Sequence, residues 1–420
     1  MTSESKTPPV VAWPDPKGTR SVPGGVTAAV GFSASGVAAG IKSESNRLDL
    51  ACIFADRPAA WAATLTHNLF AAAPVKLARE LLRGGGPLQA ILVNSGNANA
   101  ATGPAGDRHA RAVAAAVAKV LELPVGRVLV SSTGIIGRPL PVARILGAVP
   151  EAVRTLELSG GGRAAQAIMT TDTFVKQTAL ELKIGGKTVR IGGMCKGAGM
   201  IHPNMATMLA YITTDAAVPQ GLLRRLLAAA VGRTFNRINI DGDQSTNDTV
   251  VLMAGGAAGA RVPATGPDRE RFAAALAEIC RRLAELIVRD AEGATKLVEI
   301  EVRGARTDAD ALRVADAVAN SKLVKTAWFG GDLNWGRIVA AIGYAGVRIQ
   351  PERVSISLNG RGVVADGQGV PTGKMARAAR EMRQPVLRFV IDLGLGSGND
   401  RVLTCDLTDK YVFINADYPT

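Results

Sequence analysis

The sequence predicts a chain of mixed α and β structure with room for two domains or more. Short apolar runs typical of strands are broken by Gly and Ser, and they alternate with longer Ala-rich segments that have the period of amphipathic helices. The chain has 420 residues, of which 47% are hydrophobic, and this is enough to bury a substantial core. Because only 4% of the residues are aromatic, we expect a core of small side chains and close backbone packing.

The first third of the chain predicts strands and helices in alternation. After short β-type runs within 22–56, residues 71–83 (AAAPVKLARELLR) predict a helix with Pro74 in its first turn, where the missing N–H is tolerated. The apolar run 91–96 (ILVNSG) predicts a buried strand that ends on a polar turn. An Ala-rich amphipathic helix follows from Asp107 to Leu121.

A second apolar strand, 127–134 (RVLVSSTG), ends at Thr133 and Gly134. A glycine lets its backbone N–H point into a cavity, and the threonine hydroxyl is a second donor. Two such donors suit the oxyanion of an acyl-transfer reaction. A plain strand-to-helix turn is the structural alternative for the same residues.

Later segments also give local signals. Residues 180–193 (LELKIGGKTVRIGG) alternate and reverse at Gly185-Gly186, which predicts a β-hairpin. From Leu297 onward the pattern changes to short alternating strands, and the apolar run 411–415 (YVFIN) predicts a core strand that tethers the C-terminus. Helices are expected at 219–233, 267–290, 310–325 and near 374–383, and a turn between strands at 391–400.

Two motifs that suggest phosphate or metal chemistry carry little weight. The GKT at 186–188 lacks the earlier glycine of a P-loop, since Glu181 occupies that position. Asp241 and Asp243 follow an apolar run and resemble the carboxylate pair of Mg²⁺-dependent phosphotransferases. An acidic turn is structurally ordinary there, and its spacing does not fit a calcium loop. The sequence therefore predicts no metal site.

Composition excludes several classes of protein. The net charge of +13 comes from scattered Lys and Arg with almost no aromatic residues between them, which argues against nucleic-acid binding. No apolar run reaches the ~18 residues of a membrane span, and residues 1–20 predict a disordered lead-in without a signal-peptide core. We expect reduced, buried or semi-buried thiols in a cytoplasmic protein, because the cysteines are widely spaced. They are Cys52, Cys195, Cys280 and Cys405.

Residues 196–215 (KGAGMIHPNMATMLAYITTD) form the stretch around which the chain is organised. A Gly-rich approach runs into Ala206 and Thr207 and then into the apolar segment Met208 to Ile212. Small residues let the backbone bend sharply, so the Thr207 hydroxyl could attack the Ala206 carbonyl. Hydrolysis of the resulting ester would leave Thr207 as a new N-terminus, whose α-amine titrates near ~8. Nucleophile and general base would then lie on one residue. An ordinary strand residue is the alternative.

The same stretch resembles the signature of the ornithine acetyltransferase family, the glutamate N-acetyltransferases of cyclic arginine biosynthesis. Further motifs of that family follow in the right order, and together they cover the chain from about Val22 to its last residue. The motifs are VNSGNANA (93–100), SSTGIIG (131–137), MTTDT (169–173), KGAGMIHPNMATML (196–209), FNRINIDGDQSTNDT (235–249), RDAEGATKLVEI (289–300), FGGDLNWGRI (329–338) and NADYPT (415–420).

The resemblance implies a reaction and roles for individual residues. Acetyl would move from N-acetylornithine to glutamate through an acetyl ester on Thr207, with Thr133 and Gly134 as the oxyanion hole. No cofactor is implied, and whether acetyl-CoA is a second donor stays open. The implied substrate contacts are Thr170, Lys196, Thr207, Glu292, Asn415 and Thr420.

The resemblance also implies an architecture and an assembly. We expect a layered α-β-β-α core at 21–282, self-cleaved between Ala206 and Thr207, and a smaller α/β domain with a substrate-contacting tail at 283–420. The two chains would stay together as an α₂β₂ heterotetramer. Two alternatives remain: an N-terminal-nucleophile amidase or aminopeptidase, which would release acetate, and an anion- or nucleic-acid-binding protein, which would not cleave itself.

Overall fold

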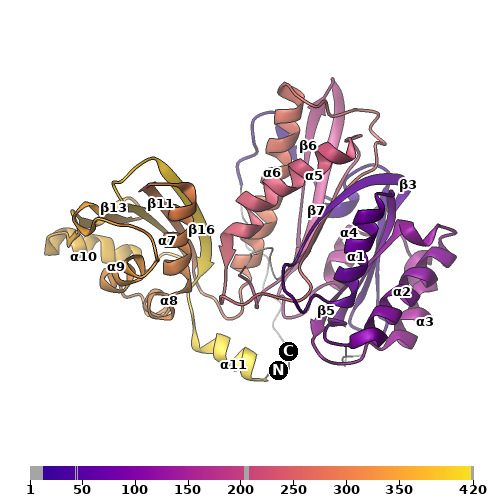
Figure 1. The fold of residues 1–420 in the computed structure, drawn as a ribbon, viewed down its shortest axis with the longest axis horizontal. Helices are drawn as coiled ribbons and strands as arrows, with labels where there is room; N and C mark the ends of the chain where they lie inside the picture. Colours follow the sequence, from indigo (N-terminus) through magenta and orange to yellow (C-terminus); the bar gives the residue numbers. More distant parts are fainter. Residues whose placement is uncertain (1–12, 43, 45, 203–207, 418–420) are drawn as a thin grey trace. The chain divides into compact units, whose positions relative to one another are not determined.

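The computed structural model describes residues 13–42, 44, 46–202 and 208–417. These residues form two compact units (Figure 1). The first unit contains the chain up to Asn236 together with Gln244–Ile287, and the second contains Arg237–Asp243 and the chain from Val288 onward. The short segment Arg237–Asp243 leaves the first unit to contribute to the second, because its strand pairs there.

The first unit is built on nine strands. Their order is β1-β6-β7-β8-β10-β3-β4-β5, with β2 paired to β3. The long strand β3 serves two sheets: its first part pairs with β2 and β4, and Ala60–Leu65 pair with β10. The strands are β1 (Thr19–Ser21), β2 (Phe32–Val37), β3 (Leu50–Leu65), β4 (Leu88–Asn97), β5 (Val128–Ile135), β6 (Lys176–Ile184), β7 (Lys187–Lys196), β8 (Leu209–Thr214) and β10 (Thr249–Ala254).

Alternating side chains on these strands produce a layered core. In β4, Ile91 faces a core shared with Met194 of β7, whereas the next residue, Leu92, faces the helices α1, α2 and α3. In β7, Cys195 points the other way from Met194 and contacts Leu283 of α6. The order is therefore helix, sheet, sheet, helix, and this confirms the expected fold class (Figure 1). The helices are α1 (Ala73–Gly84), α2 (Gly103–Val120), α3 (Val142–Arg154), α4 (Gly161–Ala167), α5 (Gln220–Arg233) and α6 (Pro267–Arg289).

The second unit has a seven-stranded sheet in the order β14-β13-β12-β15-β11-β16-β9. Its core packs the apolar face of β11 against Val314 of α7 and Trp328 of α8. The strands are β9 (Ile238–Asn239), β11 (Leu297–Ala305), β12 (Ser355–Leu358), β13 (Arg361–Ala365), β14 (Gln368–Gly369), β15 (Val386–Asp392) and β16 (Gly398–Cys405). The helices are α7 (Asp308–Asn320), α8 (Lys322–Phe329), α9 (Trp335–Gly343), α10 (Thr372–Glu381) and α11 (Asp409–Asp417). Short 3₁₀ turns lie at Gly25–Thr27, Val125–Arg127, Phe235–Arg237 and Pro351–Arg353.

Most of the predicted elements are confirmed to within a few residues, including the hairpin that reverses at Gly185-Gly186. The single helix expected at 310–325 is wrong, because two helices occupy this stretch. Ser321 ends α7, and its side chain accepts a hydrogen bond of 3.3 Å from the Val324 N–H to cap α8. A serine in a helical pattern can thus mark a new helix start rather than an interior position.

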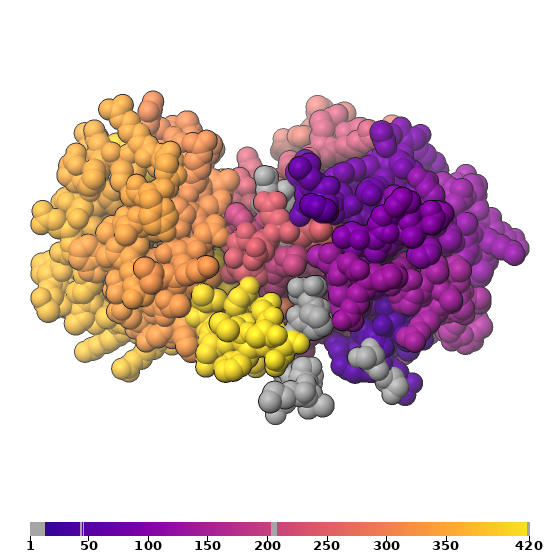
Figure 2. Space-filling model, turned by 60° about the horizontal axis from the view of Figure 1, so that its bottom comes forward, coloured from indigo at the N-terminus to yellow at the C-terminus, as the bar shows by residue number. Residues whose placement is uncertain are grey.

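Two further expectations need correction. The run 411–415 is not a core strand but part of the helix α11, which has no buried residue and lies at the surface (yellow in Figure 2). The side chains of Val412 and Phe413 are 62% and 67% exposed. A short apolar run does not distinguish strand from helix. The disorder expected over residues 1–20 is wrong from Trp13 onward, since the Trp13 indole N–H donates to Glu285 at 3.0 Å. Residues 1–12 lie outside the described residues.

All four cysteines are buried and free, as expected. Within the described parts of the chain, every helix is too short or too polar to cross a bilayer.

Candidate active site

The central stretch connects two neighbouring strands of the first unit. Lys196 ends β7 and pairs with Leu209, the first residue of β8. Next to β8 lies β10, and the Thr249 N–H donates to the Met208 carbonyl at 3.0 Å. Ala206 and Thr207 lie outside the described residues, so the nucleophile and the cleavage remain predictions. The structure describes the chain up to His202 and again from Met208.

Thr133 and Gly134 lie where the parallel pair of β4 and β5 becomes irregular. Gly96 pairs with Gly134, and Asn97 then pairs with both Thr133 and Ile135. Gly134 has a φ of 130°, and a Cβ on it would lie 2.4 Å from the Gly96 carbonyl carbon. Only glycine fits this conformation and this close approach. The β4–β5 pair therefore ends in a β-bulge and not in a plain turn.

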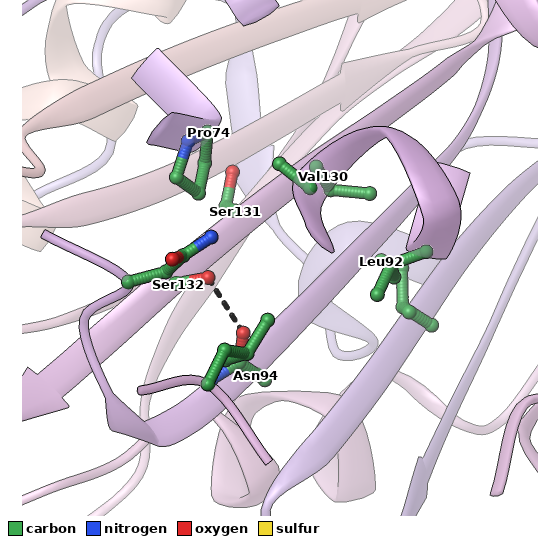
Figure 3. Close-up of a pocket in the computed structure, with 10 residues that line it drawn as sticks. Pro74, Leu92, Asn94, Val130, Ser131 and Ser132 are labelled. Carbon is green, nitrogen blue, oxygen red and sulfur yellow. Dashed lines mark hydrogen bonds between the residues drawn. The ribbon is translucent and has the colours of Figure 1, made fainter. Parts of the chain in front are cut away.

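A network of buried amides supports this bulge. The Asn94 side-chain N–H donates to the Asn97 carbonyl at 2.9 Å, and the Asn97 side chain donates to the carbonyls of Arg138 and Pro139 at 3.2 and 3.1 Å. The Ser132 hydroxyl donates to Asn94 Oδ1 at 2.6 Å beside a small cavity (Figure 3). The VNSGNANA motif thus folds into the structure that holds Thr133 and Gly134.

Asp172 brings Thr170 and Lys196 together. Its Oδ2 accepts the Thr170 N–H at 2.9 Å and lies 3.9 Å from Lys196 Nζ, while its Oδ1 accepts Lys176 Nζ at 2.5 Å and the Gly197 N–H at 2.8 Å. Burial raises the pKa of Asp172, but the two ammonium groups and the Gly197 N–H outweigh it and hold that pKa well below its usual range. Asp172 is therefore a fixed anion that contacts both Thr170 and Lys196.

Two cations surround the same loop, and the sequence reading missed both. Lys42 Nζ donates to the Met169 carbonyl at 2.7 Å, and Arg47 donates to the Thr170 carbonyl at 2.9 Å. Burial lowers the pKa of Lys42 to about 8. More than a hundred residues separate these cations from the loop that they hold, so no local pattern could have indicated the contact.

Asp248 is a second functional candidate that the sequence reading missed. It directly precedes β10, which places it beside Met208 through the register of β8 and β10. Its side chain is 3% exposed, and neither carboxyl oxygen has a hydrogen-bond partner with good geometry among the described residues. Burial raises the pKa of Asp248 well above its usual range, and the nearby Met208 N–H and Lys196 ammonium group lower it only in part.

In the second unit, the structure brings Glu292 and Asn415 together. The Asn415 side-chain N–H, on α11, donates to Glu292 Oε2 at 2.8 Å. One turn earlier on α11, the Tyr411 hydroxyl donates to Asp241 Oδ2 at 3.3 Å. Burial, together with the negative charge of Asp241, raises the pKa of Tyr411. Polar contacts thus hold α11 against two acidic segments; Thr420 lies outside the described residues.

A known protein family and several of its members match this chain over nearly its whole length. The ArgJ family profile matches residues 33–420. The "Arginine biosynthesis bifunctional protein ArgJ" of Symbiobacterium thermophilum is 47% identical over 399 residues, which cover 94% of this chain and 99% of that protein. The protein of the same name from Geobacter sulfurreducens is 49% identical over 391 residues, 93% of this chain and 99% of that protein.

Two solved structures are similar to parts of the chain. The crystal structure of arginine biosynthesis bifunctional protein ArgJ from Bacillus halodurans has 41% identity and a TM-score of 0.47, and it covers 49% of this chain and 97% of that one. The ornithine acetyltransferase of Mycobacterium tuberculosis, solved with ornithine, has 44% identity and a TM-score of 0.41, with coverage of 44% and 98%. The whole-length matches in sequence decide the assignment and confirm the resemblance drawn from the motifs: the chain belongs to the ArgJ family.

Proposed function

We propose that this chain is an acetyltransferase of arginine biosynthesis that moves an acetyl group from N-acetylornithine to glutamate. Membership of the ArgJ family and the names of its relatives support the pathway. The observation that carries the chemistry is the bulge at Thr133 and Gly134, where a position that only glycine fits is held by buried amides. Fixed donors of this kind stabilise an oxyanion without reorganising during the reaction.

The proposed reaction has two halves that share one acyl enzyme. Thr207 Oγ attacks the acetyl carbonyl of N-acetylornithine, and the Thr207 α-amine takes the hydroxyl proton. Thr133 and Gly134 stabilise the oxyanion, which collapses as the nitrogen of ornithine leaves with that proton. The glutamate amine then attacks the acetyl ester and passes its proton to the α-amine. The α-amine returns that proton to the leaving Thr207 Oγ, so that N-acetylglutamate and the free Thr207 are formed.

The proposed substrate contacts supply complementary charges. Lys196 offers a cation to a substrate carboxylate, and Asp172 Oδ2 lies 3.9 Å from its ammonium nitrogen and helps to orient it. Glu292 offers an anion to a substrate ammonium group, with Asn415 as its hydrogen-bonding neighbour. Thr170 and Thr420 complete the proposed set.

Maturation by cleavage between Ala206 and Thr207 belongs to the same proposal, since an N-terminal threonine supplies its own base. The two resulting chains would assemble as an α₂β₂ heterotetramer. The relatives of this chain are named bifunctional, so we extend the proposal to acetyl-CoA as a second acetyl donor. A cytoplasmic location stays a prediction from the sequence.

The test is an assay of acetyl transfer to glutamate with N-acetylornithine and with acetyl-CoA as donors, run side by side. We expect N-acetylglutamate from N-acetylornithine, with little acetate formed when glutamate is absent. Acetate release that is independent of glutamate would instead identify an amidase. Formation of N-acetylglutamate from acetyl-CoA as well would establish the second activity.

A further inference from the structure

Asn247 is a buried amide that connects distant parts of the first unit. It is 6% exposed and lies between α5 and β10 in the sequence, within the segment Ser245–Asp248. Its side-chain Nδ2 donates to the Ala98 carbonyl at 2.7 Å and to the Ser132 carbonyl at 2.8 Å. Its Oδ1 accepts the Thr246 hydroxyl at 2.6 Å. Both ends of the amide are therefore hydrogen-bonded.

The Ser132 carbonyl is the important acceptor, because it belongs to the same peptide group as the Thr133 N–H. A peptide group is planar, so holding the carbonyl oxygen also fixes the direction of the N–H on its other side. The Ser132 side chain is held separately, through its hydroxyl bond to Asn94 (Figure 3). Asn247 thus acts on the backbone that immediately precedes Thr133.

The second acceptor ties this peptide to the other side of the bulge. Ala98 directly follows β4, the strand whose Gly96 pairs with Gly134. The Ala98 N–H donates to the Ile135 carbonyl at 3.0 Å. One amide group therefore bridges the chain before Thr133 and the chain after Asn97. A buried amide with both donors used resists displacement, since a lost partner would leave a polar atom unsatisfied in the core.

We propose that Asn247 is a positioning residue that orients Thr133 and Gly134 for oxyanion stabilisation. The inference rests on the proposed function of these two residues and adds Asn247, which acts through the Ser132–Thr133 peptide and touches no substrate. Because small displacements of a catalytic group reduce turnover strongly, its loss lowers kcat and leaves substrate binding nearly unchanged.

The first test is a double-mutant cycle of Asn247→Leu and Thr133→Ala, measured on cleaved protein in acetyl transfer to glutamate. We expect Asn247→Leu to lower kcat about 10- to 100-fold with KM within about two-fold. The double variant should lose clearly less than the product of the two single losses, since both changes affect the same donors. An unchanged kcat, or losses that multiply in full, would contradict the proposal.

A matched control separates this effect from general destabilisation. Gln89 is a buried amide near the opposite end of β4, where its Nε2 donates to the Ala55 carbonyl at 3.5 Å and its Oε1 accepts Arg127 at 2.8 Å. Gln89→Met removes a comparable buried amide from the same strand and should leave kcat unchanged. If the Gln89 and Asn247 variants lose kcat in parallel with their thermal stability, Asn247 is merely structural.

Asn247→Asp provides a readout that a structural role would not produce. A protonated carboxyl group can still donate to one of the two carbonyls, whereas the carboxylate repels both. The kcat of this variant relative to wild type should therefore fall as pH rises, while the ratio for Asn247→Leu stays flat. A flat ratio for both variants would exclude positioning by hydrogen-bond donation.

Crystal structures of the variants test the inference without any assay. Asn247→Leu should rotate or displace the Ser132–Thr133 peptide, and Gln89→Met should leave it in place. If wild type transfers no acetyl group, the proposed function fails while this comparison still decides whether Asn247 holds the peptide. An unmoved peptide in Asn247→Leu would overturn the inference even if acetyl transfer is confirmed.

Discussion

At the scale of single residues, Asp172 and Asp248 show opposite solutions for a buried carboxyl group. Asp172 is surrounded by donors, including the ammonium group of Lys176 at 2.5 Å, so it stays ionised. Burial raises the pKa of Asp248 well above the usual range, and the Met208 N–H, the Lys196 charge and the Ser245 side chain lower it only in part. The first carboxyl group therefore lies beside Lys196 with a lowered pKa, whereas the second lies beside Met208 with a raised pKa.

Asp248 should make stability depend on pH. Its pKa is raised on folding, so its contribution is full below the unfolded pKa of about 4 and is lost as pH rises toward the folded value. Within that window wild type should lose up to about 1.4 kcal/mol per pH unit relative to Asp248→Asn. Urea unfolding of both proteins at several pH values measures this difference. Parallel curves would show that the pKa of Asp248 is not raised.

Thr133→Ala tests the proposed oxyanion donor itself. Removing the hydroxyl group should lower kcat by roughly ten- to a thousand-fold, the range for losing one such donor, with little change in KM. Steady-state kinetics at saturating glutamate give both values. A rise in KM with kcat intact would make Thr133 a binding residue instead.

At the scale of elements, α11 is held by polar contacts rather than by an apolar core. The Tyr411 hydroxyl and the Asn415 amide each donate to a carboxylate, and Gly293 approaches the helix so closely that a Cβ would lie 2.8 Å from the Tyr411 nitrogen. Such a helix depends on these contacts for its position. This explains how an exposed segment can present Asn415 in a defined orientation.

Deleting the chain from Asp409 onward should therefore lower kcat/KM for acetyl transfer by at least about ten-fold, the effect of losing one hydrogen bond to a charged group. Cleavage at Thr207 should persist, because it needs only local geometry. Val412→Ser, at an exposed position of α11, is the control and should behave as wild type. Full activity after the deletion would show that α11 takes no part in the reaction.

At the scale of the whole molecule, the proposed cut falls in the connection between two paired strands of one sheet. Strand β7 precedes it and β8 follows it, and these two strands pair from Ile191 to Lys196. The ladder of β3 with β10 joins the same two parts of the chain a second time. The structure thus provides hydrogen bonds that would keep the two fragments together after cleavage.

We expect purified protein to elute as one species in native size-exclusion chromatography and to separate into two bands on a denaturing gel. Each band should have about half of the full-length mass, because residue 207 lies near the middle of 420 residues. N-terminal sequencing of the second fragment should read TMLAY. Fragments that separate without denaturant would contradict the role given to the β7–β8 ladder.

Features that depend on neighbouring residues could be predicted from the sequence, whereas contacts between residues far apart in the chain could not. The helix that begins near Pro74 and the hairpin at Gly185-Gly186 rest on neighbouring residues, and both were found. Asn247 holds Ser132 from 115 positions away, and this contact has no local signature. The prediction for the run 411–415 was wrong because a core strand and an exposed helix differ in burial. The apolar pattern of five residues does not indicate whether a segment is buried.

The proposed reaction requires Thr207 to carry the acetyl group, and one measurement tests this directly. Cleaved enzyme is mixed with N-acetylornithine, quenched in acid before glutamate is added, and digested for mass spectrometry. We expect one acetyl group on the peptide that begins at Thr207, attached through Oγ, and we expect a parallel sample chased with glutamate before the quench to have lost it. Steady turnover with no acetyl group on that peptide, or an acetyl group on another residue, would contradict it.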